Sequence, residues 1–317
     1  MTVVERAYAK VNLGLKVLGR RSDGYHDILT VMQTVDLYDE VTLEEAEGIS
    51  LTCSDPNLPE HPENIAHRAA ESFLEAFGIL KGVSIHLKKR IPVGAGFGGG
   101  SSDAAAVLRG LCRLYGIRPK PGELEALASS LGSDVTFLLR PGTAVARGRG
   151  EVLRYVPWPF EVFYVLAHPG FGISTRWAYG EVDKIFLTSG DEYFNLVSLL
   201  ENGNPPQDPW GMFENDFSSL VEGKYPQVRR LLRRLEEEGA LVALLSGSGS
   251  GVFGIFTSEE AARRVAEKLK EEASWAVACS PVAARSSNWQ DSGLWSRLSR
   301  FESSPGSQSS KERGCTT

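Results

Sequence analysis

Residues 92–106 read PVGAGFGGGSSDAAA, a glycine-rich segment that leads into two serines, an aspartate and three alanines. Five of the seven residues from Gly94 to Gly100 are glycine. Glycine has no β-carbon, so this backbone can adopt positive φ angles and approach a ligand closely. Apolar residues recur at helical spacing from Ala104 to Tyr115, and the free N–H groups at the start of such a helix favour an anion. The segment therefore predicts a phosphate-binding loop in front of a helix.

The pattern G-x-G-x-x-G, present in residues 94–99, is shared by dinucleotide-binding proteins and protein kinases. The run before it, Val83–Ile91, alternates apolar and polar residues, whereas the strand before a dinucleotide-binding loop is apolar on both faces. No Gly-Lys-Ser or Gly-Lys-Thr follows the glycines, which argues against a Walker A loop. A connecting turn without a ligand is the structural alternative. The hydroxyls of Ser101 and Ser102 can cap the helix, donate to phosphate or help hold a metal ion.

The composition is that of a soluble globular protein long enough for two domains, with 317 residues, 42% hydrophobic and 23% charged. The net charge of -6 argues against a nucleic-acid partner. No run approaches the roughly 18 apolar residues of a membrane span, and the first residues lack an apolar signal segment. The cysteines are scattered without a C-x-x-C pair, which predicts reduced thiols in a cytoplasmic protein. They are Cys53, Cys112, Cys279 and Cys315.

An antiparallel hairpin is expected near the N-terminus. Apolar and polar residues alternate from Ala7 to Val17, which predicts a half-buried strand, and again over Ile28–Val41 after the turn residues Ser22, Asp23 and Gly24. Apolar spacing predicts further elements downstream. These are helices over Asn64–Phe77, from Ser101 to Gly116 and over Glu123–Leu131, and a strand over Val83–Ile91.

The C-terminal half predicts an antiparallel α+β layer after a boundary near Pro157–Pro159. The region from Asp183 to Trp210 reads as irregular and turn-rich. The remaining elements are a strand over Phe163–Ala167, helices over Gln227–Glu238 and Glu259–Glu272, and strands over Leu241–Leu245, Val252–Phe256 and Ala276–Ala284. We therefore expect domains at residues 1–157 and 158–287, and a serine-rich, disordered tail at 288–317.

Four segments resemble motifs of the GHMP small-molecule kinases. The glycine-rich segment resembles their ATP-binding motif, and three others narrow the resemblance: Ala9–Leu13 with Arg21–His26, Leu131–Val135, and Leu245–Gly254. Over roughly residues 5–287 the chain is similar to the 4-diphosphocytidyl-2-C-methyl-D-erythritol kinases within that superfamily. The element Asp23-Gly-Tyr-His26 is the specific part.

This resemblance implies a two-domain α+β fold, with a mixed or antiparallel sheet and helices in the N-terminal domain and a ferredoxin-like C-terminal layer. It implies a transferase of isoprenoid biosynthesis in the non-mevalonate pathway, which phosphorylates the 2-hydroxyl of a cytidine-diphosphate-linked sugar alcohol. ATP accompanied by Mg²⁺ is the phosphate donor. The implied ATP-binding residues are Pro92, Val93, Gly94, Ala95, Gly96, Phe97, Gly98, Gly99, Gly100, Ser101 and Ser102.

Lys10 and Asp134 are the catalytic candidates that the resemblance favours over a surface lysine and a helix-capping aspartate. Asp134 would accept the proton of the attacking hydroxyl, and Lys10 would orient that carboxylate and stabilise charge near the γ-phosphate. Asn12 lies on the same strand face as Lys10, about 7 Å away, and is a substrate candidate. Tyr25 would stack on the cytosine and His26 would hydrogen-bond its edge.

Three alternative functions stay open from the sequence. They are a GHMP kinase for a small alcohol such as homoserine or mevalonate, a nucleotide-binding regulator without chemistry, and a dinucleotide-dependent oxidoreductase. Asp216 and the loop Ser246–Gly251 are expected to border the cleft, the loop through a diphosphate or a close backbone contact. No protein ligand set for a metal is identified, since the histidines lack metal-like spacing. We expect small-molecule partners, no nucleic acid, no membrane, and a monomer or homodimer.

Overall fold

The computed structural model describes residues 1–60, 63–184 and 191–283. Its larger sheet is built on a long antiparallel hairpin of β1 (Thr2–Arg20) and β2 (His26–Ala46). The predicted turn closes this hairpin, with Gly24 at φ 85° and the Arg21 N–H donating to the Tyr25 carbonyl at 2.8 Å. The remaining strands follow the order β3-β4-β2-β5-β6. They are β3 (Ser50–Cys53), β4 (Gly82–Lys88), β5 (Thr143–Arg147) and β6 (Val152–Val156).

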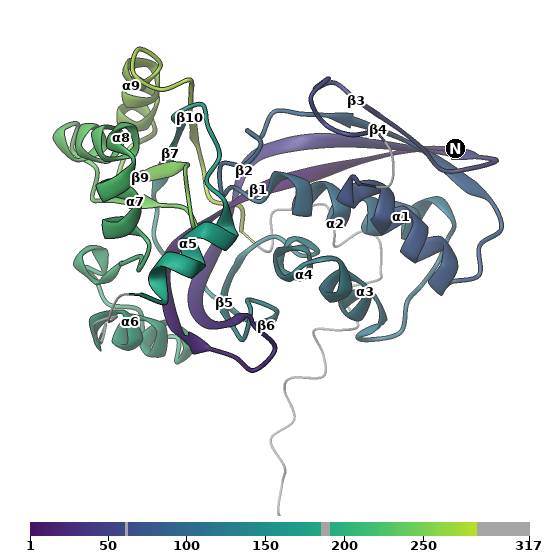
Figure 1. The fold of residues 1–317 in the computed structure, drawn as a ribbon, viewed down its shortest axis with the longest axis horizontal. Coiled ribbons are helices and arrows are strands. Elements are labelled where there is room, and N and C mark those ends of the chain that lie inside the picture. Colours follow the sequence, from purple (N-terminus) through teal and green to yellow (C-terminus); the bar gives the residue numbers. More distant parts are fainter. Residues whose placement is uncertain (61–62, 185–190, 284–317) are drawn as a thin grey trace, which may run out of the picture.

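Four helices cover one face of this sheet (Figure 1). They are α1 (Ile65–Ala76), α2 (Gly99–Leu114), α3 (Glu123–Leu131) and α4 (Ser133–Leu138). The helices predicted from apolar spacing are confirmed to within two residues, and Asn64 caps α1 by accepting the Ala66 N–H at 3.0 Å. Their apolar stripes join the strands in one core because each stripe faces the sheet.

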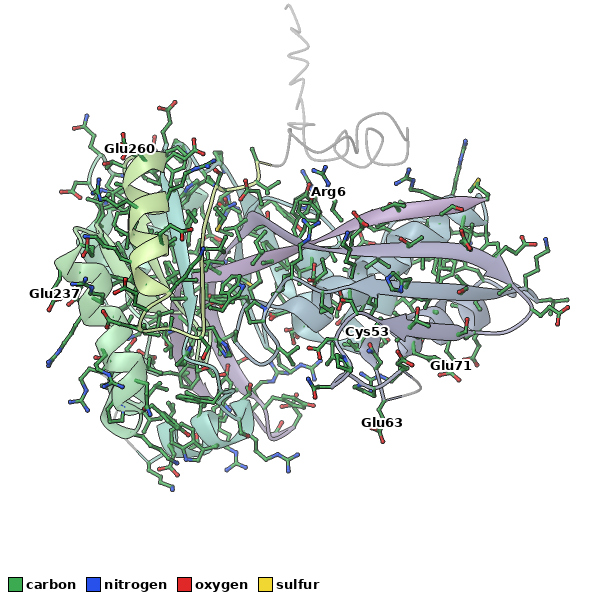
Figure 2. All side chains as sticks on the ribbon, turned by 90° about the horizontal axis from the view of Figure 1, so that it is seen from above. Arg6, Cys53, Glu63, Glu71, Glu237 and Glu260 are labelled. Atoms are coloured by element: carbon green, nitrogen blue, oxygen red, sulfur yellow. The ribbon has the colours of Figure 1, made fainter. Side chains whose placement is uncertain are left out.

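Figure 2 looks onto the other face of the larger sheet, where the strands lie in front of the helices. On β4 the side chains of Ile85 and Leu87 are buried, whereas His86 and Lys88 are exposed. The predicted polar side of this strand is therefore confirmed. β4 pairs antiparallel with β2 and parallel with β3, and its exposed side distinguishes it from the strands of a parallel dinucleotide-binding sheet, which are buried on both faces.

The C-terminal sheet has the strand order β10-β7-β9-β8, with every neighbouring pair antiparallel. Its strands are β7 (Phe163–His168), β8 (Val242–Leu245), β9 (Val252–Phe256) and β10 (Trp275–Cys279). The helices α7 (Ser218–Lys224), α8 (Pro226–Glu237) and α9 (Glu259–Leu269) pack in the core on this sheet. The predicted helix-strand-strand-helix-strand succession is confirmed, and with β7 it gives a ferredoxin-like layer.

Both faces of β1 are buried, so the prediction of a half-buried strand was wrong for this element. Lys10 is 4% exposed and Asn12 is 3% exposed. Val11 and Leu13, on the opposite face, share a core with Tyr164 of the C-terminal sheet. The strand lies between the helices of one domain and the sheet of the other, an arrangement that alternation along one strand cannot reveal. The boundary at residue 157 stays a proposal.

The region from Asp183 to Trp210 is more regular than predicted. It contains α6 (Asp191–Glu201), which follows α5 (Thr175–Val182), and ends at the short 3-10 helix Trp210–Met212. Four apolar side chains of α6 are buried at helical spacing: Tyr193, Leu196, Val197 and Leu200. Polar and turn-forming residues around this short run masked its periodicity. The tail 288–317 lies outside the described residues.

Candidate active site

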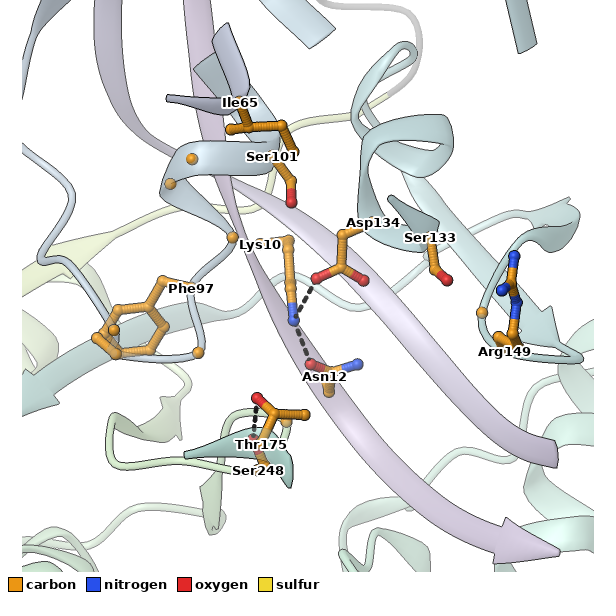
Figure 3. A pocket seen from close by; sticks show the side chains of 18 of the residues that line it. Lys10, Asn12, Ile65, Phe97, Ser101, Ser133, Asp134, Arg149, Thr175 and Ser248 are labelled. Atoms are coloured by element: carbon orange, nitrogen blue, oxygen red, sulfur yellow. Dashed lines mark hydrogen bonds and ion pairs between the residues drawn. The ribbon is translucent and has the colours of Figure 1, made fainter. Parts of the chain in front are cut away.

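A cavity of about 1090 Å³ opens beside β1 and the glycine-rich segment. On the N-terminal side its walls come from β1, the start of β2, the segment before α1, the glycine-rich segment with the first turn of α2, the first turn of α4 and the turn between β5 and β6. On the C-terminal side they come from α5 and the loop after β8. Figure 3 shows that Lys10, Asn12, Ser101 and Asp134 point toward a common space. Segments far apart in the sequence therefore build one site.

The glycine segment has the backbone predicted for an anion-binding loop. Gly94, Gly96 and Gly98 have φ angles of 71°, 79° and 75°. Gly98 caps α2 without a side-chain hydrogen bond, and the Ser102 N–H makes the first helical bond, to Gly98 at 2.8 Å. The N–H groups of residues 99–101 therefore have no helical acceptor, and they stand at the positive end of the helix dipole. This is a suitable position for phosphate oxygens.

The second glycine loop, residues 246–251, supports the first. The Gly251 N–H donates to the Ala95 carbonyl at 3.0 Å, and the Ser246 hydroxyl donates to the Gly96 carbonyl at 3.0 Å. A β-carbon on Gly96 would lie 2.2 Å from the Ser246 carbonyl oxygen. Of the two uses predicted for the second loop, the structure contains the close backbone contact. The loop still lines the cavity with Gly247 and Ser248.

Lys10 and Asp134 meet in the cavity, with Lys10 Nζ 3.3 Å from Asp134 Oδ2 (Figure 3). Lys10 comes from β1, beside a register shift between Tyr8 and Lys10, and its N–H donates to the Phe97 carbonyl at 3.0 Å. Asp134 lies in the first turn of α4, whose N-cap is Gly132, so the capping alternative is wrong. The Lys10 side chain is 5% exposed and that of Asp134 is 36% exposed. The carboxylate is thus the open member of the pair.

Asn12 holds the lysine in place. Its carboxamide oxygen accepts from Lys10 Nζ at 2.6 Å, and its Nδ2 donates to the Thr30 hydroxyl at 3.0 Å. That hydroxyl donates in turn to the Gly14 carbonyl at 2.6 Å. This chain of bonds fixes the carboxamide orientation, with the oxygen toward the ammonium. Asn12 also lines the cavity, where it was placed as a substrate candidate.

Tyr25 and His26 line the far end of the cavity, at the hairpin turn. Tyr25 is 56% exposed, and Arg149 lies over its ring with Cζ 4.6 Å from the centroid. His26 Nε2 is 2.7 Å from Asp183 Oδ1, and its ring stacks on Tyr179 at 4.8 Å. The sequence analysis missed Arg149, Asp183 and Tyr179. No local pattern marks them, because their partners lie far away in the chain.

The two serines after the glycines differ in position. Ser101 lines the cavity, and its hydroxyl makes no hydrogen bond within the described ranges. Ser102 is fully buried, and its hydroxyl donates to the Tyr8 carbonyl at 2.6 Å. Phe97 likewise has a buried side chain and contributes backbone to the wall. Successive residues of α2 point about 100° apart, so only one serine faces the ligand space.

A buried charge cluster lies under the glycine loop. Lys89 Nζ bonds to both Asp39 and Asp103, and Asp39 also accepts the N–H groups of Arg90 and Ile91, the latter at 2.9 Å. Burial raises the pKa of Asp103 to about 7; the Lys89 ammonium opposes the shift and the Asp39 carboxylate adds to it. The cluster ties the start of the glycine segment to β2 and α2.

Asp216 was expected to border the cleft, but it does not line the cavity. Its carboxylate binds Lys16 Nζ at 2.7 Å and accepts the Val17 N–H at 2.7 Å. The side chains of Lys16 and Asp216 are 4% and 7% exposed. Asp216 therefore joins β1 to the C-terminal domain, because the segment that carries it packs along the strand.

Comparisons with known proteins show the family of the chain. The model of the GHMP kinases N terminal domain matches residues 64–142, and that of the GHMP kinases C terminal domain matches residues 207–274. A 4-diphosphocytidyl-2-C-methyl-D-erythritol kinase from Moorella thermoacetica is 41% identical over 273 residues, covering 84% of this chain and 94% of the relative. The kinase of the same name from Alkaliphilus metalliredigens is 40% identical over 268 residues, covering 83% and 91%.

Solved structures give the same result. A crystal structure of 4-(cytidine 5'-diphospho)-2C-methyl-D-erythritol kinase has a TM-score of 0.71 and 37% identity, covering 88% of this chain and 98% of that one. A homoserine kinase from Cytophaga hutchinsonii has a TM-score of 0.72 at 21% identity, covering 89% and 96%, and shares the fold alone. The chain belongs to the 4-diphosphocytidyl-2-C-methyl-D-erythritol kinase family of the GHMP kinases.

Proposed function

We propose that this chain transfers the γ-phosphate of ATP to the 2-hydroxyl of 4-diphosphocytidyl-2-C-methyl-D-erythritol, a step of the non-mevalonate isoprenoid pathway. The observation that carries the proposal is the Lys10–Asp134 pair, 3.3 Å apart, which faces the same cavity as the open N-terminus of α2. The names and identities of the relatives support the choice of substrate.

ATP binds with its phosphates on the glycine segment. The candidate residues 92–102 present three unpaired N–H groups and the Ser101 hydroxyl to the cavity. Ser102 acts indirectly here, because its hydroxyl anchors α2 to β1. The second glycine loop keeps the first in its positive-φ conformation through the Ala95 and Gly96 carbonyls.

Mg²⁺ would accompany the nucleotide. The described ranges contain no group of three His, Cys, Asp or Glu side chains placed to hold a metal. Mg²⁺ in kinases commonly takes one or two protein oxygens together with substrate phosphates and water, and the Ser101 hydroxyl at the head of α2 fits that role. The ion would neutralise charge on the transferred phosphate.

Phosphoryl transfer requires positioning and charge neutralisation more than covalent chemistry by the protein. Asp134, the exposed member of the pair, accepts the proton of the attacking 2-hydroxyl. Lys10 orients this carboxylate, and it has three N–H donors. Two of them are directed at Asp134 and Asn12, so the third can stabilise charge near the γ-phosphate.

The cytidine end of the substrate lies at the hairpin turn. Tyr25 offers an exposed ring for stacking on cytosine. His26 is held by Asp183 through Nε2, which leaves Nδ1 for the edge of the base. The cavity reaches from this end to Asp134, which suits a nucleotide-linked substrate better than a small alcohol.

A coupled ADP-release assay tests the proposal. We expect turnover with ATP and 4-diphosphocytidyl-2-C-methyl-D-erythritol, and turnover at least about a hundredfold lower with homoserine or mevalonate, because these alcohols cannot reach the hairpin turn. Comparable or faster turnover of either small alcohol would overturn the substrate assignment. No turnover of any of the three would overturn the activity itself.

We also propose a cytoplasmic enzyme that works as a monomer or homodimer. Cys53, Cys112 and Cys279 are free thiols, as a reducing compartment predicts. Within the described ranges, no helix has the length and apolar character to cross a membrane.

A further inference from the structure

Three of the five lysines and arginines on the described cavity wall already have a carboxylate beside them; of the other two, Arg176 is exposed on α5 and Arg149 lies against Tyr25. Lys10 is paired with Asp134, and Lys89 with Asp39 and Asp103. Arg20 Nη1 is 3.8 Å from Asp183 Oδ2. These charges are largely neutralised by the protein itself. A substrate diphosphate needs a cation with donors to spare.

Arg149 is in a different situation. Among the described residues its closest carboxylate contact is long, 3.9 Å from Nε to Glu151 Oε1, and its side chain is 32% exposed on the cavity wall. Its guanidinium lies over the Tyr25 ring, with Cζ 4.6 Å from the centroid. A guanidinium that stacks through its face keeps its edge N–H groups for hydrogen bonds in its own plane.

The turn that carries Arg149 is held firmly between β5 and β6. The Gly148 carbonyl accepts the Ile28 N–H at 2.8 Å, and the Gly150 N–H donates to the Arg147 carbonyl at 3.0 Å. The Glu151 carboxylate accepts the Arg149 N–H at 2.6 Å. The arginine is therefore presented by a fixed backbone, which lowers the entropy lost when it binds a ligand.

The same turn lies beside the catalytic end of the cavity. A β-carbon on Gly150 would lie 3.6 Å from Ser133 Cβ, next to Asp134. Figure 3 shows Arg149 beyond Ser133 on the side away from the glycine segment. The turn that carries Arg149 thus lies near the base-stacking candidate Tyr25 and also next to Ser133, the neighbour of Asp134. In the substrate, the diphosphate stands between the cytidine and the reacting alcohol.

We propose that Arg149 binds the diphosphate of the cytidine-linked substrate through its edge N–H groups while its face holds Tyr25 in the base-stacking position. This proposal rests on the proposed function, because it takes the substrate to be a nucleoside-diphosphate-linked alcohol. The planar fork of a guanidinium matches two phosphate oxygens. Arg149 is thereby a specificity-determining residue that favours diphosphate-linked substrates over free nucleosides and small alcohols.

Binding of CDP and of cytidine, measured by calorimetry on the full chain, separates the two contacts. Arg149→Met should weaken CDP binding by at least about tenfold, since a charged hydrogen-bonding group is lost. The binding of cytidine, which has no phosphate, should weaken by less than about fivefold, because only the contact between residue 149 and Tyr25 is lost. Arg149→Lys keeps the charge without the fork and should fall between Arg149→Met and the wild type for CDP.

Arg140→Met is the matched control, because Arg140 Cζ lies 4.6 Å from the Tyr155 centroid but does not line the cavity. It should leave both affinities unchanged, and thermal unfolding checks that all variants fold. Equal weakening of CDP and cytidine by Arg149→Met, or no weakening of either, overturns the diphosphate contact. The wild type tests the proposed function separately: if it binds CDP but does not turn over the cytidine-linked substrate, the function fails and the Arg149 contact is still judged by the variants.

Discussion

At the scale of single residues, the site combines a buried cation with an open anion. Lys10 is 5% exposed and tied to Asn12 and Asp134, whereas Asp134 is 36% exposed. Because two acceptors restrict the position of the lysine ammonium group, its charge is preorganised for the proposed transition state. The carboxylate keeps access to an incoming hydroxyl. This difference in exposure between Lys10 and Asp134 favours Asp134 as the proton acceptor.

Asp134→Asn should lower kcat by about 10²- to 10⁴-fold, because the amide cannot accept the proton of the hydroxyl. The KM for ATP should change little, since Asp134 does not belong to the glycine segment. Steady-state kinetics with the cytidine-linked substrate measures both. Glu259→Gln, a surface change on α9, is the control. A kcat of Asp134→Asn within about threefold of the wild type removes Asp134 from catalysis.

Asp103 should make stability depend on pH. Its pKa is raised from 3.8 to about 7 in the folded protein, so the unfolded chain loses this proton at lower pH than the folded one. The free energy of unfolding therefore falls as pH rises from about 4 to about 7. Asp103→Asn has no carboxyl group that titrates at this position. The free energy of unfolding of this variant, relative to that of the wild type, should therefore rise by about 1–3 kcal/mol between pH 5 and pH 8.

Urea unfolding at several pH values measures this difference. Glu267→Gln, which changes a surface pair with Lys270 on α9, should show no such trend. Parallel pH curves for the wild type and Asp103→Asn would show that Asp103 is ionised in the folded protein throughout. Lys89 is kept intact in this test because it bonds to both carboxylates.

At the scale of elements, the two glycine loops act as one unit. The loop of residues 94–100 contains glycines with positive φ angles, and the loop of residues 246–251 packs against it through backbone contacts. Neither Gly96 nor Gly251 tolerates a side chain. A β-carbon on Gly96 would lie 2.2 Å from the Ser246 carbonyl oxygen, and one on Gly251 would lie 2.3 Å from the Ala95 carbonyl oxygen. Glycine is therefore needed at Gly251 for close packing, and at Gly96 for close packing and for its positive φ angle.

Gly96→Ala should raise the KM for ATP by at least about tenfold, because the added methyl group forces the loops apart and displaces the N–H groups. Its matched control is Gly122→Ala. Gly122 has a similar φ of 85° against 79° for Gly96, but nothing lies within 4 Å of its added β-carbon. The control should lose about 1–2 kcal/mol of stability through backbone strain and keep its KM for ATP. An unchanged KM in Gly96→Ala would contradict the role of the contact.

At the scale of the whole molecule, β1 joins the two domains. It pairs with β2 along its whole length, and its Leu15 N–H also donates to the Glu214 carbonyl of the C-terminal segment at 2.8 Å. Lys10 and Asn12 lie on the same strand, so the lysine proposed for catalysis stands where the larger sheet meets the C-terminal segment. The buried pair of Lys16 and Asp216 secures the same strand.

Asp216→Asn should destabilise the protein by about 2–4 kcal/mol, because it removes a buried charge that faces Lys16. Urea unfolding gives the free energy of unfolding, and kcat at saturating substrate checks that the site itself is intact. Lys184→Gln, which breaks a surface pair with Glu181, should cost less than about 1 kcal/mol. A loss below about 0.5 kcal/mol in Asp216→Asn would show that the pair does not secure the domains.

The sequence predicted the elements whose signals are local. The helix of residues 123–131, the hairpin turn at Gly24 and the positive φ angles of the glycine segment all follow from residue spacing and from glycine itself. Helix α6 was missed because its buried run of Tyr193 to Leu200 is short and lies among turn-forming residues. Its contacts with the larger sheet, such as the Val31 N–H bond to the Tyr193 hydroxyl at 2.8 Å, are not local.

By itself the sequence determined the types of residue that the chemistry needs, the glycine-rich loop before its helix, and most helices and strands, because each depends on neighbours within a few positions. Only the tertiary structure decided that both faces of β1 are buried, that Ser101 faces the cavity while Ser102 anchors a strand, and that Arg149 covers Tyr25. These outcomes depend on packing between distant segments. Local periodicity carries no information about which segments will meet.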